Sequence, residues 1–373
     1  MKLGMIPTHI KNEVYISYLP LAHMLERLVV NTCIINGYSI GYFQGNILKI
    51  KEDLAALKPT KFVSVPRLFN KFYSILSSKM NEKTGFTEKL VKKAVETKLK
   101  NLRTKGVVKH NLYDQLVFKK MKAVLGGRVS WMLSGGAPIA GEVLEMLQIC
   151  FSCKIVEGYG QTETGASGCV TDLKETRSGN IGAPMLCCEV KLVDVAEMNY
   201  FSTDMVDGKN VPRGEICMKG PNVMDCYFQQ KEKTEETIDK DGWLHTGDVG
   251  AIIEGGCVKI IDRMKNLFKM AQGEYVAVEK LENKYIQSPF VSQIFVYGNA
   301  YQHYLVAIIV PEQETVIKWA DEKEAEQDYE GLCHNTDLKS DILDNMINLG
   351  REAKVKSLLS YFYYFASLMA LNL

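Results

Sequence analysis

The chain has 373 residues, 46% of them hydrophobic and 24% charged, which is the composition of a globular protein of two or three domains. Its 45 basic and 44 acidic residues leave a net charge of +1, and this balance argues against a nucleic acid held mainly by phosphate contacts. Ten cysteines are too few for a dense disulfide framework, and no secretory signal opens the sequence, so we expect a reducing compartment. The C-x-x-C of Cys150 and Cys153 lacks a second ligand pair, which predicts buried thiols rather than a zinc site.

Strands and helices alternate in the first part of the chain. The predicted strands are residues 14–18, 38–43 and 61–65, and the predicted helices are 20–28, 45–57 and 66–80. Such alternation implies right-handed crossovers and a parallel sheet. Residues 85–125 are mostly helical, and their lysines are interleaved with acidic and polar residues, which indicates a solvated face.

His23 stands where the first strand passes into its helix. A zinc helix of the H-x-x-E-H kind is excluded, because Arg27 occupies the position of the second histidine. The residue is therefore either an ordinary histidine packed at a helix start or part of a site.

Residues 127–138 form a strand that runs into a glycine loop, followed by a helix over 141–151. Backbone N–H groups and the positive end of a helix dipole suit an anion or a closely packed ring. The loop is neither G-x-G-x-x-G nor G-x-x-x-x-G-K-[ST], which lowers the case for a dinucleotide or for a P-loop.

A second glycine turn, residues 154–165, reads KIVEGYGQTETG. Its β-branched pair indicates the end of a buried parallel strand, and ligands of open α/β sheets bind just beyond such ends. Gly158 and Gly160 let the backbone turn and approach a ligand closely. The hydroxyl of Thr162 can donate to a phosphate oxygen, and Glu163 offers a hard oxygen ligand for Mg²⁺. The turn predicts a nucleotide site, and the alternative is an ordinary strand-to-loop connection.

Beyond this turn the hydrophobic period changes to two, which predicts an antiparallel β-subdomain over residues 186–262. Its predicted strands are 189–195, 214–219, 243–245, 249–253 and 258–261. Asp248 lies in a tight turn where its carboxylate could accept two hydrogen bonds from a ribose diol, although aspartate is also a common turn residue. Arg263 follows the last strand, and residues 266–274 have the composition of a domain boundary.

The remaining segments predict a small α+β domain. Its helices are placed at 276–286 and 337–354, and its strands at 291–297 and 304–310. Residues 357–373 carry no charge but fall short of the roughly 20 apolar residues that span a bilayer. A partly buried or aberrant terminus is therefore preferred to a membrane-inserting tail.

Seven segments, in order, carry a resemblance to the long-chain fatty-acid–CoA ligases of the adenylate-forming superfamily. They are YLPLAHMLER, PTKFVSVPRLFNKFY, GGRVSWMLSGGAP, EGYGQTETG, KLVDVAEMNY, DGWLHTGD and KIIDRMKNLFKMAQGEYVAVEKLE, and the match covers about residues 12–356. The resemblance implies an α/β fold with a mostly parallel sheet, flanking helices, an antiparallel β-subdomain and a smaller C-terminal α+β domain. The expected domains are residues 1–262, a hinge at 263–274 and residues 275–356.

The resemblance also implies a two-step reaction with ATP, Mg²⁺ and coenzyme A. The carboxylate of a long-chain fatty acid attacks the α-phosphate of ATP, and the thiol of coenzyme A then displaces AMP. Because charge moves onto phosphate oxygens, the site needs fixed donors and a metal ion more than a protein nucleophile. The absence of a Ser-His-Asp elbow agrees with this chemistry.

The family motifs assign roles by position. Gly135, Gly136 and Ala137 would line the adenine and acyl-carboxylate pocket beside Glu157, Gly158, Tyr159 and Gly160, with the Tyr159 ring stacked on the base. Thr162 would bond the α-phosphate, Glu163 would hold Mg²⁺, Asp248 and Arg263 would hold the ribose, and His23 would border the acyl carboxylate. Lys265 would occupy the hinge, and Lys269 and Gly273 would face the coenzyme A channel.

Two family segments have no counterpart in the sequence. These are the SGTTGxPKG loop, which grips the β- and γ-phosphates, and the lysine of a T-P-x-x-K segment near the C-terminus. Impaired turnover is therefore expected, and the alternative is a non-catalytic module that binds nucleotide or an intact ligase subunit. The family is tethered to the cytosolic face of the endoplasmic reticulum or to the outer mitochondrial membrane, and no such anchor is recognised here.

Overall fold

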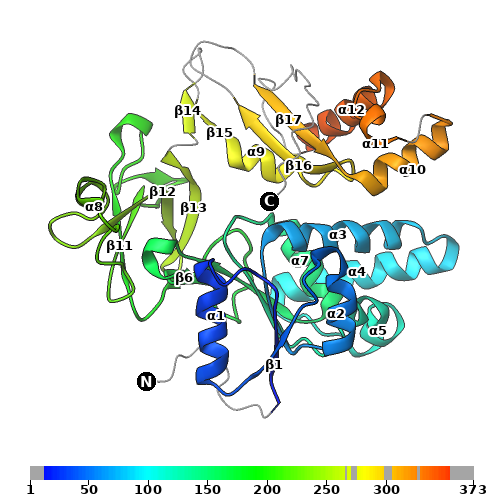
Figure 1. Cartoon of the computed structure of the whole chain (residues 1–373), viewed down its shortest axis with the longest axis horizontal. Coiled ribbons are helices and arrows are strands. Elements are labelled where there is room, and N and C mark those ends of the chain that lie inside the picture. The colour runs from blue at the N-terminus through cyan, green and yellow to red at the C-terminus, as the bar shows by residue number, and fades with distance from the viewer. Residues whose placement is uncertain (1–11, 265–266, 270–274, 298–304, 326–327, 353–373) are drawn as a thin grey trace. The chain divides into compact units, whose positions relative to one another are not determined.

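The computed structural model describes residues 12–264, 267–269, 275–297, 305–325 and 328–352 (Figure 1). The chain divides into two compact units, residues 1–261 and 262–373. Each unit has its own hydrophobic core, so each is described by itself.

The first unit is built on a seven-stranded sheet, and the expected α/β class is confirmed. Its order is β2-β1-β3-β4-β5-β6-β7, in which the first five strands are parallel and the last two antiparallel. The strands are β1 Val14–Ser17, β2 Ser39–Tyr42, β3 Lys61–Ser64, β4 Trp131–Ser134, β5 Lys154–Tyr159, β6 Cys169–Val170 and β7 Ala183–Pro184. Strand β3, the middle one of the five parallel strands, is buried along its whole length. Its apolar residues are Phe62 and Val63, and the buried Lys61 at its start lies 3.0 Å from the Glu13 carboxylate.

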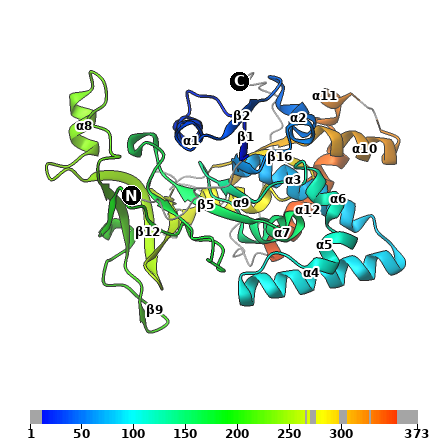
Figure 2. The same ribbon diagram turned by 90° about the horizontal axis from the view of Figure 1, so that it is seen from below.

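Helices connect the successive parallel strands, as the alternation predicts. They are α1 Met24–Ile35, α2 Ile50–Leu57, α3 Pro66–Asn81, α4 Gly85–Lys105, α5 Asn111–Leu116, α6 Lys119–Ala123 and α7 Gly141–Phe151, and a short 3₁₀ helix, Ile47–Lys49, precedes α2. Helices α3, α4 and α7 pack together beside the sheet (Figure 2). Phe62 of β3 lies between Phe69 and Phe72 of α3 in the core of this layer.

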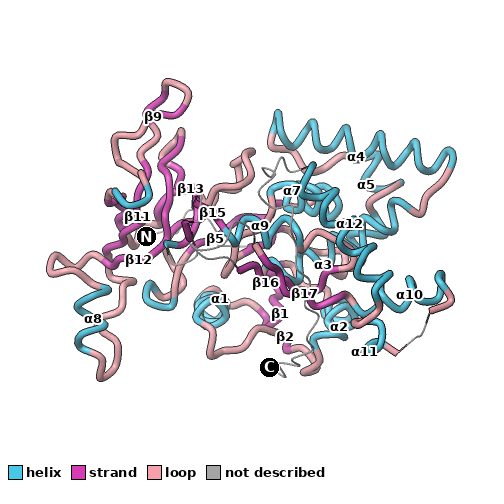
Figure 3. Tube along the Cα trace, turned by 90° about the horizontal axis from the view of Figure 1, so that it is seen from above, coloured by secondary structure: helices cyan, strands magenta, loops and turns pink. Residues whose placement is uncertain are grey.

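The β-subdomain is a four-stranded antiparallel sheet of order β13-β12-β11-β8. Its strands are β8 Glu189–Val193, β11 Arg213–Lys219, β12 Leu244–Ile253 and β13 Cys257–Arg263, and the smaller elements beside it are the hairpin β9 Met205–Val206 with β10 Lys209–Asn210, the 3₁₀ helix Ala196–Met198 and the helix α8 Lys231–Thr237. Figure 3 shows these strands gathered away from the helices α4, α5 and α7. The separate strands predicted at 243–245 and 249–253 are one strand, β12, interrupted by a bulge.

The second unit contains α9 Val278–Tyr285, β16 Val291–Tyr297, β17 Val306–Pro311, α10 Gln313–Lys323, α11 Tyr329–Leu332 and α12 Thr336–Glu352, preceded by the hairpin β14 Leu267–Lys269 and β15 Tyr275–Ala277. The helix predicted from residue 276 begins later, because Val276 pairs with Phe268 in that hairpin. Trp319 and Ile342 are buried together in the core of this unit.

No helix in the described part of the chain is long and apolar enough to cross a bilayer. The apolar segment 357–373 lies outside the described residues. Cys150 and Cys153 are buried free thiols, as their lone C-x-x-C pattern predicts.

Candidate functional site

The carboxyl ends of three adjacent parallel strands meet at one edge of the sheet. The hydroxyl of Tyr18, just past β1, donates to the Ser64 hydroxyl at the end of β3 over 2.7 Å. The N–H of Gly135, just past β4, donates to the Ser64 carbonyl over 3.2 Å. A Cβ at Gly135 would lie 3.5 Å from the Gly158 carbonyl oxygen, so the two predicted glycine loops are neighbours.

The loop after β4 presents its backbone. Gly136 has φ +86°, a conformation that favours glycine, and Gly136 and Ala137 are both exposed. The hydroxyl of Ser134 is buried beneath this loop and, among the described residues, has no hydrogen-bond partner. Buried polar groups are normally satisfied, so a polar group or water at this position would fit the loop.

The glycine turn, residues 157–165, continues from β5 into a one-turn 3₁₀ helix, Thr162–Thr164. Gln161 caps this turn, and its backbone N–H donates to the Thr164 hydroxyl over 2.9 Å. From outside the turn, the Asn222 amide donates to the carbonyls of Thr164 and Ser167. This bracing holds Thr162, whose side chain is exposed, at the rim of the turn.

Asp248 reaches the glycine turn from the β-subdomain. Its Oδ2 accepts from the Tyr159 hydroxyl over 2.5 Å and from the Gln161 amide over 2.9 Å, and the residue is 2% exposed. Gln161 donates as well to the Thr246 carbonyl over 2.9 Å. Burial, and then the Asp248 carboxylate, raise the pKa of Tyr159 well above its usual value, so the phenol stays a proton donor.

Glu163 is half-buried and is oriented by a tyrosine from a distant loop. The Tyr227 hydroxyl donates to Glu163 Oε1 over 2.6 Å, and the Met224 N–H donates to the Glu163 carbonyl over 2.8 Å. Burial, followed by this carboxylate, raises the pKa of Tyr227 to about 12. A carboxylate oriented by a neighbouring donor is the ligand type that Mg²⁺ takes, so Glu163 fits the metal role predicted for it.

His23 is the N-cap of α1. Its Nδ1 accepts from the Leu25 N–H over 3.2 Å, so this nitrogen holds the helix start, and the side chain is exposed. Leu25 lies 3.5 Å from the Cβ position of Gly135, which brings the start of α1 to the loop after β4. The structure therefore shows a capping role for His23 and places its helix beside the candidate site.

A buried carboxylate that the sequence analysis did not select lies one turn further along α1. Glu26 is fully buried and accepts from the hydroxyls of Tyr15 and Ser17, each over 2.6 Å. Burial raises the pKa of Glu26, and the two hydrogen bonds oppose that rise. The network ties α1 to β1 and so fixes the start of the helix at the site.

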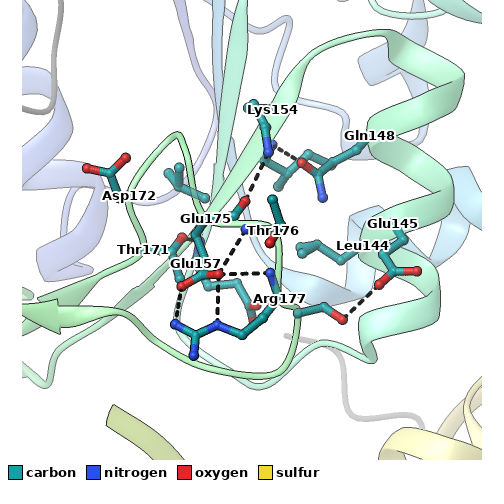
Figure 4. A pocket seen from close by; sticks show the side chains of 13 residues that line it. Leu144, Glu145, Gln148, Lys154, Glu157, Thr171, Asp172, Glu175, Thr176 and Arg177 are labelled. Carbon is teal, nitrogen blue, oxygen red and sulfur yellow. Dashed lines mark hydrogen bonds and ion pairs between the residues drawn. The ribbon is translucent and has the colours of Figure 1, made fainter. Parts of the chain in front are cut away.

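Glu157 points into a polar pocket whose lining includes Gln148, Thr171 and Arg177 (Figure 4). Burial raises the pKa of Glu157 to about 7, and a backbone hydrogen bond from Gly179 opposes the rise. The backbone of Glu157 is fixed by Thr171, whose hydroxyl accepts the Glu157 N–H over 2.8 Å.

The other predicted site residues belong to the second unit. Arg263 ends β13 and is exposed, and Lys269 ends β14. Lys265 and Gly273 lie outside the described residues, so their roles in the hinge and in the coenzyme A channel stay predictions.

Gln161, Asn222 and Tyr227 complete the site but were not selected from the sequence. Gln161 stands inside the glycine turn, between Gly160 and Thr162, which were selected. Its position in that motif, with a side-chain amide that can donate to a carboxylate, is the signal that could have found it. Tyr227 is 64 positions from Glu163, and no local pattern connects the two.

Together, the glycine loops at the carboxyl edge of a parallel sheet and the carboxylate from a β-subdomain agree with the adenylate-forming class that the sequence resembles. The family model of the AMP-binding enzyme matches residues 2–228. The chain belongs to this family.

Among curated proteins, the chain is 44% identical over 346 residues to long-chain-fatty-acid–CoA ligase 1 of Homo sapiens, covering 92% of the chain and 48% of the relative. It is also 44% identical to the peroxisomal long chain acyl-CoA synthetase 6 of Arabidopsis thaliana, covering 92% and 49%. These similarities confirm the resemblance to long-chain acyl-CoA synthetases. The chain spans about half the length of the curated relatives it matches.

Solved structures give the same picture of the fold. The adenylation domain of a carboxylate reductase from Mycobacterium chelonae has a TM-score of 0.74 and 29% identity, covering 98% of this chain and 50% of that one. The corresponding domain from Segniliparus rugosus, solved with AMP and a co-purified carboxylic acid, has a TM-score of 0.71 and 28% identity, covering 95% and 49%.

Proposed function

We propose that the chain provides the nucleotide and acyl-carboxylate floor of a long-chain-fatty-acid–CoA ligase. In this activity a fatty carboxylate attacks the α-phosphate of ATP, and coenzyme A then displaces AMP from the acyl-adenylate. The observation that carries the proposal is that Tyr159 and Gln161, both in the glycine turn, donate hydrogen bonds to the Asp248 carboxylate. Two donors fix one carboxylate oxygen beside a backbone turn suited to a nucleotide, and a carboxylate held in this way is a strong acceptor for a ribose diol.

The residues of the first unit have different proposed roles. The loop of Gly135, Gly136 and Ala137 borders the base and the acyl carboxylate, and the exposed Thr162 donates to the α-phosphate. Glu163 would hold Mg²⁺, which supplies positive charge to the phosphate oxygens when bound. His23 keeps the start of α1 at this edge, next to the proposed position of the acyl carboxylate.

The first experiment is calorimetry of the purified 373-residue chain with a non-hydrolysable palmitoyl-adenylate mimic. We expect saturable binding by wild type and strongly reduced binding by Asp248→Asn. A cooperatively melting chain that takes up no mimic would overturn the proposal. Palmitate-dependent acyl-CoA formation with ATP, Mg²⁺ and coenzyme A is measured separately, because binding and complete turnover need different parts of a ligase.

A second candidate function is a non-catalytic module that binds an intact ligase subunit. The observation that favours it is a group of exposed apolar side chains around β2, which among the described strands is paired on one side only. These side chains are Ile34, Ile35, Tyr42, Ile47 and Leu48. Such a surface invites association. Light scattering of the chain alone and mixed with a full-length ligase tests this function. A monodisperse monomer for the chain alone, and two separate species without a complex in the mixture, would count against it.

We further propose the membrane association and the cytosolic location at endoplasmic reticulum or outer mitochondrial membrane that the resemblance implies. Cell fractionation of the tagged chain is the test. Recovery in the high-speed supernatant alone would contradict this location.

A further inference from the structure

The pairing of β11 with β12 is interrupted where β12 carries Asp248. Glu215 pairs with Val249 and Cys217 pairs with His245, so Ile216 alone stands opposite three residues of β12. Those three, Thr246, Gly247 and Asp248, are named here the Asp248 bulge. Bulges redirect side chains and are frequent beside active sites. In this chain the bulge directs Asp248 to the glycine turn, where Tyr159 and Gln161 donate to it.

The carboxylate of Glu215 spans the bulge from the neighbouring strand. Its Oε1 accepts from the Gly247 N–H over 3.0 Å, and its Oε2 lies 2.8 Å from His245 Nδ1. The Glu215 side chain is 12% exposed and the His245 side chain 31%, so the carboxylate is the more shielded of the two. Gly247 has φ +70°, a left-handed conformation, and its N–H therefore points where a regular strand would not place it.

The Thr246 hydroxyl makes two further hydrogen bonds at the bulge. It donates to the Ile216 carbonyl over 2.6 Å and accepts from the Asp248 N–H over 3.1 Å. The backbone N–H groups of Gly247 and Asp248, which the bulge takes out of the strand pairing, thus both have side-chain partners. Glu215 is the charged member of this arrangement, and hydrogen bonds to a charged acceptor are the stronger ones.

Glu215, Cys217 and His245 also offer three potential metal ligands within 4.8 Å of one another. The distances favour a hydrogen bond over a metal centre. Two oxygen or nitrogen ligands on a tetrahedral zinc ion lie about 3.3 Å apart, given bonds of about 2.0 to 2.1 Å. The 2.8 Å between Glu215 and His245 is shorter than this and is an ordinary hydrogen-bond distance.

We propose that Glu215 is a positioning residue for nucleotide recognition: its carboxylate holds Gly247 and His245 so that Asp248 faces the ribose. This inference rests on the proposed function, because it assumes that Asp248 accepts from the ribose hydroxyls. Glu215 itself lies behind the bulge and acts through Asp248. The predicted defect is accordingly in the recognition of the ribose diol, with contacts to the base and phosphate left in place.

The test compares the dissociation constants of AMP and 2′,3′-dideoxy-AMP by calorimetry on the full chain. Wild type should prefer AMP by about a hundredfold or more, the effect of two hydrogen bonds to a carboxylate. Glu215→Ala should lower this preference by about tenfold, and Glu215→Gln should restore part of it, because the amide oxygen can still accept from Gly247. A role limited to stability would lower the melting temperature and leave the AMP preference of the folded fraction unchanged.

Exposed Glu189, in the neighbouring strand β8, provides the matched control, and Glu189→Ala should keep the wild-type preference. Asp248→Asn distinguishes a failure of the ribose assignment from a failure of the positioning role of Glu215. If wild type shows no preference for AMP, or Asp248→Asn retains it, the ribose assignment fails. If Asp248→Asn abolishes the preference while folded Glu215→Ala and Glu215→Gln both retain it in full, only the positioning role of Glu215 is overturned.

Discussion

The two walls of the candidate site are built by different means. One wall is the glycine turn with the loop after β4, where the backbone itself lies at the surface and glycines allow close approach. The other wall is the Asp248 bulge, where a buried carboxylate is aimed by side chains from two strands. A backbone wall tolerates no added atom where two chain segments approach closely, whereas a side-chain wall tolerates no lost hydrogen bond. The two should therefore fail in different ways.

The largest effect is expected from breaking the side-chain wall at Asp248. Asp248→Asn removes the charge that would accept from two ribose hydroxyls, and each hydrogen bond to a charged group contributes about 1.5 to 3 kcal/mol. We expect the affinity for AMP to fall about a hundredfold or more in calorimetry. Asp241→Asn, an exposed aspartate at the start of the same DGWLHTGD segment, should bind AMP normally, and equal losses in both variants would contradict the prediction.

The backbone wall is broken at Gly160. A Cβ there would stand 2.4 Å from the Ala166 carbonyl carbon, which is backbone and cannot swing aside. Gly160→Ala should therefore destabilise the first unit by roughly 2 to 3 kcal/mol, the cost of overpacking, as measured by urea unfolding.

Gly158→Ala is the matched control for Gly160→Ala. Its Cβ would meet only Leu133 side-chain atoms at 3.6 Å or more, an ordinary contact. Unfolding curves that shift equally for the two variants would show that the close approach of residues 160 and 166 is not what limits the turn.

The backbone wall was largely predictable from the sequence. In the side-chain wall Asp248 was selected, but the contacts that orient it were not. The helix predicted over 141–151 and the strand over 291–297 agree with α7 and β16 residue for residue, because periodicity and glycine or proline boundaries are local signals. Gly135 and Gly158 were selected for the same reason. The conformation of these segments is indicated by residues within a few positions along the chain.

The missed features depend on contacts between distant positions. Gln161 and Asp248 are 87 residues apart, and the bulge in β12 exists only because β11 lies beside it. The alternating pattern on either side of the bulge therefore looked like two strands. β15 was predicted as the start of a helix, since three residues of pairing with β14 leave no periodic signal of their own.

Through Glu157, the free energy of unfolding is expected to depend on pH. The pKa of Glu157 is about 7 in the folded chain against an ordinary value of 4.5, so between these values the folded state binds more protons than the unfolded one. The stability from this group is complete below pH 4.5 and is lost as the pH rises through 7. Relative to Glu157→Gln, wild type should therefore lose roughly 3 kcal/mol between pH 4.5 and pH 7.5, as measured by urea unfolding. Parallel pH profiles for the two proteins would contradict the assignment.

The smallest effect is expected at Tyr227, which joins neither wall but orients Glu163. Tyr227→Phe removes a hydroxyl that donates to the Glu163 carboxylate over 2.6 Å and keeps the ring. If Glu163 holds Mg²⁺, the carboxylate loses an orienting partner but keeps its charge, so the Mg²⁺ concentration for half-maximal ATP binding should rise by about tenfold or less. Glu163→Gln should raise it further, and Tyr42→Phe, at an exposed tyrosine of β2, should leave it unchanged. A Tyr227→Phe protein with the wild-type Mg²⁺ requirement, alongside a defective Glu163→Gln protein, would show that the carboxylate is oriented by the turn alone.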